Sequence, residues 1–198
     1  MRVAEIKLKK CKAPGCSQRF KPTMTTQKVC SIACAKAMAK DPKLQKVAAK
    51  AITKQARQDL QERREKLKTK GDHLREAQQA FNAYIRERDR LAGYRCISSG
   101  RPLDWNGNAV DAGHYRSTGA APHLRFDENN CHAQSKHDNR YLSGNVADYR
   151  IGLIERIGLE AVEALERDQS ARRYTIEDLQ AIKALYRQKL KDLRRAAA

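Results

Sequence analysis

Four of the five histidines lie between His114 and His137. His114 ends a short run of strand-forming residues, Asn130 follows sixteen positions later, and Asn139, whose amide oxygen can bind a metal, follows after nine more. A neutral imidazole can take a proton from water near pH 7, and one Mg²⁺ held by oxygen ligands can neutralise a phosphate. This spacing predicts a one-metal centre that hydrolyses phosphodiester bonds. Taken alone, a histidine after a strand is more often an ordinary polar residue.

The distribution of charge indicates a polyanionic partner. Of the formal charge of +18, residues 1–40 carry +9 and residues 41–92 carry +6. Residues 93–145 and 146–198 carry only +1 and +2. The first half is therefore expected to bind nucleic acid, and the nearly neutral remainder to perform the chemistry. Charge does not distinguish DNA from RNA, so an RNA-binding protein is one alternative.

Four of the six cysteines form two closely spaced pairs, Cys11 with Cys16 and Cys30 with Cys34. Four thiolates satisfy tetrahedral Zn²⁺, and a stretch of about 34 residues with few large apolar side chains cannot easily fold without such a crosslink. Unpaired buried thiols are the alternative. Disulfides are not expected, because the chain has no secretory leader and no apolar run near the ~20 residues of a membrane span. We therefore expect a soluble, cytoplasmic protein that does not bind membranes.

The remaining pattern predicts a helix-rich α+β fold in three parts. Residues 1–40 form the four-cysteine zinc module, residues 41–92 a basic helical arm, and residues 93–198 the core with C-terminal helices. The arm is a solvated spacer, a dimerisation helix or a helix that lies along DNA. Within the core, strands are expected at residues 109–114 and 123–126 and a helix at 130–141, capped by Asp127 or Asn129. Three more helices follow, at residues 146–157, 159–168 and from Thr175, whose spacing to Asp178 is typical of a capping box.

These features resemble the ββα-metal (HNH) endonucleases, and over nearly its whole length the chain resembles the NinG (Rap) recombination endonuclease family of phage lambda. The segments that carry the resemblance are the four-cysteine module and residues 112–117, 124–126, 129–134 and 143–145. The resemblance implies that His114 is the general base, that Asn130 orients the imidazole, and that Asn139 and an acid near the base hold Mg²⁺ or Mn²⁺.

The acid and the further ligands depart from the family pattern. Gly113 occupies the position of the family's acid, and the nearest acid is Asp111, which on a regular strand faces away from His114 because the offset of three is odd. His132 is the third candidate ligand, although it can equally contact phosphate or lie on a solvated helix face. Four cations flank the centre and are expected to contact DNA: Arg116, Arg125, Lys136 and Arg140.

A second structural zinc, which many HNH enzymes carry, is not expected. Cys96 with Ser99 and Ser135 with Asp138 have the spacing of its two knuckles, but only one of the four positions is a thiol. Cys96 and Cys131 are therefore interpreted as structural thiols.

The resemblance further implies cleavage of branched recombination intermediates such as Holliday junctions and D-loops, by a homodimer, in the host cytoplasm. The alternative is a non-enzymatic zinc-finger protein that binds DNA as a recombination accessory factor.

Overall fold

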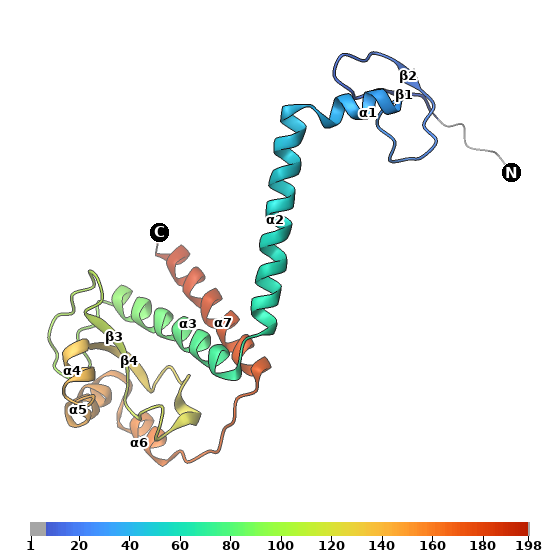
Figure 1. Cartoon of the computed structure of the whole chain (residues 1–198). Coiled ribbons are helices and arrows are strands. Elements are labelled where there is room, and N and C mark those ends of the chain that lie inside the picture. Colours follow the sequence, from blue (N-terminus) through green and yellow to red (C-terminus); the bar gives the residue numbers. More distant parts are fainter. Residues whose placement is uncertain (1–6, 198) are drawn as a thin grey trace. The chain divides into compact units, whose positions relative to one another are not determined.

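The computed structural model describes residues 7–197 (Figure 1), and the chain divides into two compact units, Met1–Leu67 and Lys68–Ala198. The helix-rich α+β class is confirmed. The boundary expected near residue 92 falls instead after Leu67, because the helix that follows packs entirely within the second unit. No helix among residues 7–197 combines the length and apolar character needed to cross a membrane.

The first unit begins with a small cysteine module and ends in a long helix. Strands β1 (Lys9–Lys10) and β2 (Arg19–Phe20) pair antiparallel, with Lys9 opposite Phe20. Helix α1 (Ile32–Ala39) begins where the Ser31 side chain accepts a hydrogen bond from the backbone N–H of Cys34. Helix α2 (Pro42–Lys66) begins with Asp41 as its cap and proline at its first position.

Helix α2 has no buried residue over its 25 positions. Leu44, Val47 and Ile52 are 40%, 64% and 70% exposed. In most proteins a helix of this length is stabilised by packing of one face, and within its own unit α2 has no such packing.

The second unit is built around helix α3 (Lys70–Leu91), whose Ala77, Phe81 and Ile85 recur every four residues and are fully buried. Thr69 and Asp72 form a capping box at its start. Helix α3 packs along α7 (Ile176–Ala196) and also contacts strands β3 (Val110–His114) and β4 (Cys131–Ser135) (Figure 1). The two strands pair antiparallel from Val110 opposite Ser135 to His114 opposite Cys131.

A second hydrophobic cluster of this unit is formed by helices α5 (Val146–Ile157) and α6 (Leu159–Arg167). Tyr149 and Leu153 of α5 are fully buried against Ile97 and Val162. Gly152 permits this approach, since a Cβ there would lie 2.0 Å from the carbonyl oxygen of Ile97. The three helices predicted after residue 145 are thus confirmed as α5, α6 and α7.

Two predicted elements were wrong. Residues 123–126 do not form a strand, because Pro122 starts a 3-10 turn, η1 (Pro122–Leu124). The helix predicted for residues 130–141 is strand β4 followed by the short helix α4 (Lys136–Arg140). Asp127 accepts hydrogen bonds from the backbone N–H groups of Asn129 and Asn130, which turns the chain into β4, and Ser135 is the cap of α4.

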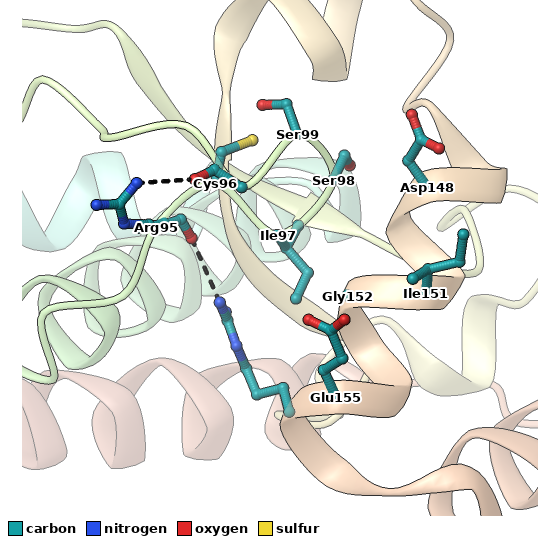
Figure 2. A pocket seen from close by; sticks show the side chains of 11 residues that line it. Arg95, Cys96, Ile97, Ser98, Ser99, Asp148, Ile151, Gly152 and Glu155 are labelled. Carbon is teal, nitrogen blue, oxygen red and sulfur yellow. Dashed lines mark hydrogen bonds between the residues drawn. The ribbon is translucent and has the colours of Figure 1, made fainter.

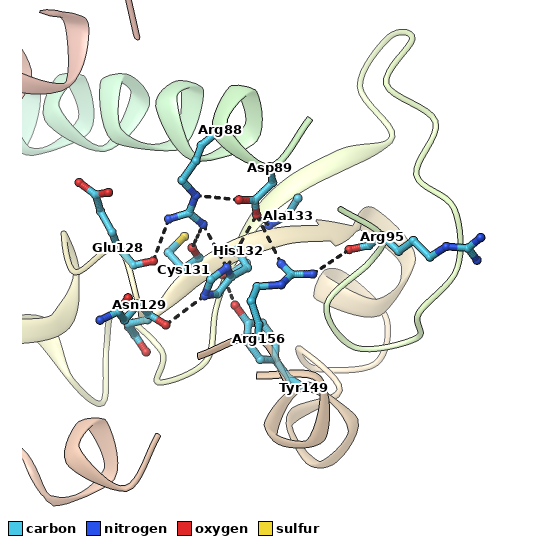
Figure 3. A network of polar contacts seen from close by, with 12 residues as sticks. Arg88, Asp89, Arg95, Glu128, Asn129, Cys131, His132, Ala133, Tyr149 and Arg156 are labelled. Carbon is cyan, nitrogen blue, oxygen red and sulfur yellow. Dashed lines mark hydrogen bonds and ion pairs between the residues drawn. The ribbon is translucent and has the colours of Figure 1, made fainter. Parts of the chain in front are cut away.

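A buried ionic cluster joins α3, β4 and α5 (Figure 3). The Asp89 carboxylate is fully buried and accepts a 2.6 Å hydrogen bond from the backbone N–H of Ala133 in β4. It also meets Arg88 Nε at 2.7 Å and Arg156 Nη1 at 3.6 Å. The Arg156 guanidinium lies 4.1 Å over the Tyr94 ring. Because Asp89 contacts three elements at once, it sets the position of β4, and through β4 that of β3.

We expect Asp89→Ala to destabilise the second unit by about 3–5 kcal/mol, because it leaves the partly buried Arg88 and Arg156 without their counterion. Urea unfolding followed by Trp105 fluorescence measures this, since Trp105 is the only tryptophan and lies in this unit. Asp192→Ala removes an exposed ion pair with Arg195 and is the control, expected to cost at most about 1 kcal/mol. Equal destabilisation of the two variants would contradict a central role for Asp89.

Candidate active site

Asp111 and Asn139 meet on one face of the β3–β4 hairpin. Asn139 Nδ2 of α4 donates to Asp111 Oδ2 at 3.1 Å, and Arg140 Nε donates to the same oxygen at 2.9 Å. Burial opposes ionisation of Asp111, but the hydrogen bonds from Arg140 and Asn139 outweigh it and lower the pKa of this carboxyl. The structure therefore brings together a carboxylate and an amide from two elements, with the amide nitrogen of Asn139 facing the Asp111 carboxylate.

His114 lies at the end of the same strand but faces α3. Its ring is 6.0 Å from that of Phe81, Nε2 is 3.0 Å from the carbonyl oxygen of Arg125, and Nδ1 is 3.7 Å from the Cys131 sulfur. A carbonyl only accepts, so Nε2 carries the proton and Nδ1 is left as the acceptor. Burial lowers the pKa of His114, which keeps the ring neutral. The odd offset between Asp111 and His114 thus places them on opposite faces of the strand.

Asn130 is fully buried and fixes the loop between the strands rather than the imidazole. Its Oδ1 accepts from the backbone N–H of Arg116 at 2.8 Å, and its Nδ2 donates to the carbonyls of Arg116 and Leu124 at 3.0 and 3.1 Å. The structure does not place Asn130 in hydrogen-bond contact with His114. Any effect of Asn130 on His114 passes through the loop, which carries the Arg125 carbonyl that holds His114 Nε2.

His132 belongs to the Asp89 cluster and not to the Asp111–Asn139 pair (Figure 3). Its Nδ1 accepts from Arg88 Nη2 at 3.0 Å and its Nε2 donates to the Asn129 carbonyl at 3.2 Å. Burial, reinforced by the Arg88 charge, lowers the pKa of His132 to about 3. With both nitrogens engaged, the imidazole has no lone pair free for a metal, so the structure does not group His132 with the other candidate ligands.

The four flanking cations divide into two kinds. Arg116 Nη1 donates to the carbonyls of Leu165 and Asp168 at 2.8 and 2.7 Å, and Arg125 donates to Gln78 and to the Thr118 carbonyl. These two arginines hold the core together. Arg140 and Lys136 lie on α4, where the Arg140 side chain is 60% exposed. Only the α4 pair is placed to meet a ligand beside Asp111.

The four positions that have the spacing of a second zinc site, Cys96, Ser99, Ser135 and Asp138, lie close together but include only one thiol. Asp138 Oδ2 accepts from Ser99 Oγ at 2.8 Å, Ser135 Oγ at 2.7 Å and Cys96 Sγ at 3.1 Å. Burial opposes ionisation of Asp138, but hydrogen bonds, led by the one from Ser135, lower its pKa. Hydrogen bonds to one carboxylate therefore tie the turn at residues 95–100 to α4, which supports the interpretation of Cys96 as a structural thiol.

Gln134 is a buried residue whose role the sequence did not reveal. It shares the Asp111 face of the hairpin, and its Nε2 donates to Ser98 Oγ at 2.6 Å and to the Gly144 carbonyl at 2.7 Å. Its Oε1 is buried without a hydrogen-bond partner. A Cβ on Gly113 would lie 2.1 Å from this oxygen, so the glycine makes room for the Gln134 amide.

A pocket of about 370 Å³ opens beside this region, between the turn at residues 95–100 and α5. Figure 2 shows Ser98 and Ser99 of the turn and Asp148 and Glu155 of α5 around it. Arg95 and Arg156 also line the pocket, so it carries charges of both signs. None of the site residues expected from the sequence lines it.

The four N-terminal cysteines lie close together, as their spacing predicts. Their sulfurs lie within 4.8 Å of one another, with Cys30 Sγ 3.5 Å from Cys34 Sγ and 3.8 Å from Cys16 Sγ. A hydrogen bond from the Ala13 backbone lowers the pKa of Cys11 to about 7. The four thiols are free, and their arrangement can hold one metal ion.

Comparison with known proteins gives matches to phage proteins. A model of the family described as the bacteriophage lambda NinG protein matches residues 3–196. The chain is 43% identical over 203 residues to protein ninG of Salmonella phage P22, with 97% of each chain covered. It is 43% identical over 197 residues to protein ninG of Escherichia phage lambda, which covers 94% of this chain and 93% of the relative. Protein ninG of Escherichia phage 933W is 52% identical over 130 residues, 65% of this chain and 61% of the relative. No solved structure matches the chain significantly.

We expect Cys16→Ser to lower the bound zinc from about one ion per chain to near zero, because three thiolates bind Zn²⁺ far more weakly than four. Elemental analysis of protein purified without chelator measures the zinc, and circular dichroism measures the loss of structure. Cys131→Ser is the control, since Cys131 lies in the second unit and should leave the zinc content unchanged. A wild-type protein without zinc would contradict the prediction.

Proposed function

The chain belongs to the family of the bacteriophage lambda NinG protein, and from this premise we propose that it is a metal-dependent DNA endonuclease that cleaves branched recombination intermediates. The substrates would be Holliday junctions and D-loops in the cytoplasm of the infected cell. The observation that carries the proposal is the order of strand, loop, strand and helix at residues 110–140. This order brings Asn139 of α4 into hydrogen-bond contact with Asp111 of β3, the strand that ends at His114.

Each residue of this arrangement has a proposed role. Asp111 and Asn139 supply oxygen ligands to Mg²⁺ or Mn²⁺, and Arg140 contacts the phosphate from the exposed side of α4. A bound divalent ion would neutralise charge on the phosphate and the leaving oxygen. His114, neutral because of its burial, takes the proton from the attacking water. Asn130 holds the loop that carries the Arg125 carbonyl, and so positions His114 indirectly.

The proposed DNA-binding surface lies mainly on the first unit. Residues 1–67 hold 18 Lys and Arg against 5 Asp and Glu, a net charge of +13, whereas residues 68–198 carry +5. On α2, Lys46, Lys50, Lys54 and Arg57 follow one another at intervals of three or four and so share one exposed face. The four-cysteine module would use structural Zn²⁺ to hold its fold. A phosphate backbone is the complementary partner for such a row of cations.

A homodimer is part of the proposal, because two related strands of a four-way junction must be cut and a two-fold axis presents one centre to each. The apolar residues of α2 do not sustain the seven-residue repeat of a coiled coil, so α2 is assigned to DNA rather than to self-association.

A non-enzymatic DNA-binding accessory protein is the second candidate function. The observation that favours it is the orientation of His114, which faces Phe81 and Cys131 and not the Asp111–Asn139 pair. If the histidine stays in that position on DNA, the chain has no base next to its metal ligands.

Cleavage of a four-way junction and of a matched linear duplex, with Mg²⁺, Mn²⁺ or EDTA, tests the proposal. We expect His114→Gln to cut about 10²–10⁴-fold more slowly, since its amide can keep the bond to the Arg125 carbonyl but cannot act as a base. His123→Gln is a matched control, because His123 Nε2 likewise meets a backbone carbonyl, that of Asp168, at 3.0 Å. Cleavage by His114→Gln within a few-fold of wild type would exclude the base role.

The metal ligands are tested separately. We expect Asn139→Ala to lose activity at low Mg²⁺ and to regain part of it at high Mg²⁺ or Mn²⁺, because the ion is held more weakly but its chemistry is intact. His114→Gln should show no such rescue. Equal rescue of both variants, or of neither, would contradict this assignment of roles.

The distribution of charge along the chain predicts which residues contribute most to DNA binding. Replacing Lys46, Lys50 and Lys54 by Gln should lower the salt slope of log K for duplex DNA by up to about 0.9 for each phosphate that the variant no longer neutralises. The control replaces the exposed Arg187, Lys191 and Arg195 of α7 by Gln. Fluorescence anisotropy across a salt series, in EDTA, measures both. An equal or larger decrease for the α7 variant would place the main phosphate contacts on the second unit.

A further inference from the structure

An exposed apolar tip follows directly after α4. Tyr141 is 77% exposed, Leu142 48% and Val146 51%, and all three lie within one segment of six residues. Scattered exposed apolar residues are ordinary, but three large ones together next to a charged helix are not, and they indicate a contact surface.

The tip is held in a strained conformation. Ser143, Gly144 and Asn145 have φ values of 50°, 85° and 47°, so three consecutive residues adopt the left-handed region, and two of them are not glycine. The Gly144 N–H donates to the Asp138 carbonyl, and its own carbonyl accepts from the buried Gln134 Nε2. These hydrogen bonds to the core offset the strain and hold the tip in its exposed conformation.

The neighbours of the tip are cationic. Arg140 precedes Tyr141 and is 60% exposed, and Lys136 lies one helical turn before it. The rings of His137 and Tyr141 are 5.8 Å apart, so the aromatic surface extends along α4. A flat aromatic group beside cations matches a nucleotide, whose base stacks and whose phosphate is negative, better than it matches an apolar protein surface.

We propose that Tyr141 and Leu142 form a wedge that contacts an unstacked DNA base next to the Asp111–Asn139 pair. This inference rests on the proposed DNA-binding function and adds a source of preference for branched substrates. A base at a branch or bulge is already partly unstacked, so the wedge engages it at lower cost than a base inside a continuous duplex. Tyr141 is then a specificity-determining residue, and Arg140 holds the adjacent phosphate.

Binding is measured in EDTA, so that the result does not depend on cleavage. Two fluorescent probes of the same sequence are compared, a linear duplex and the same duplex with one unpaired adenine, by anisotropy titration. We expect wild type to prefer the bulged probe and Tyr141→Ala to lose about tenfold in affinity for that probe alone, the size typical of one base stacked on an aromatic ring. Tyr141→Phe should keep the preference, because stacking does not need the hydroxyl.

Ile151→Ala is the matched control, since Ile151 is a 60% exposed apolar residue of α5 outside the tip, and it should bind both probes as wild type does. The inference is overturned if wild type shows no preference, or if Tyr141→Ala binds both probes unchanged or weakens equally on both. It is also overturned if light scattering shows that Tyr141→Ala dissociates a wild-type dimer, because the tip is then a protein interface. If the protein does not cleave DNA in Mg²⁺ but its preference for the bulged probe depends on Tyr141, the proposed nuclease activity is wrong and the proposed base contact stands.

Discussion

The carboxylate of Asp89 is the interaction on which the arrangement of the second unit depends. It is fully buried, and it accepts a backbone hydrogen bond from Ala133 while pairing with Arg88 of α3 and Arg156 of α5. Taking these charges out of water is costly, and the cost is met only while all three elements are in place. Strand β4 is held in this way from its outer edge, its register fixes β3, and β3 carries both Asp111 and His114.

The chain uses two solutions to one structural problem, the fixing of short loops that have little core of their own. In the first unit four sulfurs gather within 4.8 Å, an arrangement suited to one metal ion. In the second unit the equivalent crosslink is made by Asp138, which accepts from Ser99, Ser135 and Cys96. A carboxylate with three donors needs no metal, but it works only because the surrounding unit already has a hydrophobic core. The first unit has too few buried apolar residues for that substitution.

The sequence predicted those parts of the fold that depend on local chemistry: the cysteine cluster, the capping box of α7 and strand β3. The wrong predictions concern residues whose structure is determined by contacts with segments distant in the sequence. Residues 131–135 look helical by their caps, yet they form a strand because β3 supplies the hydrogen bonds and α3 covers them. His132 could not be excluded as a ligand, because its engagement by Arg88 depends on α3, which the sequence placed in an arm outside the core.

The two faces of β3 keep His114 apart from the Asp111–Asn139 pair. His114 is held away from the Asp111–Asn139 pair by one hydrogen bond to the Arg125 carbonyl, a long contact with the Cys131 sulfur, and packing on Phe81. A hydrogen bond of this kind contributes about 0.5–1.5 kcal/mol, and turning the ring would also give up its packing on Phe81. The loop that carries Arg125 runs from His114 to Asn130 and lies against the same end of the hairpin. In the proposed mechanism a phosphate beside Asp111 would therefore meet the imidazole only after this loop yields, so substrate binding would be the step that assembles the centre.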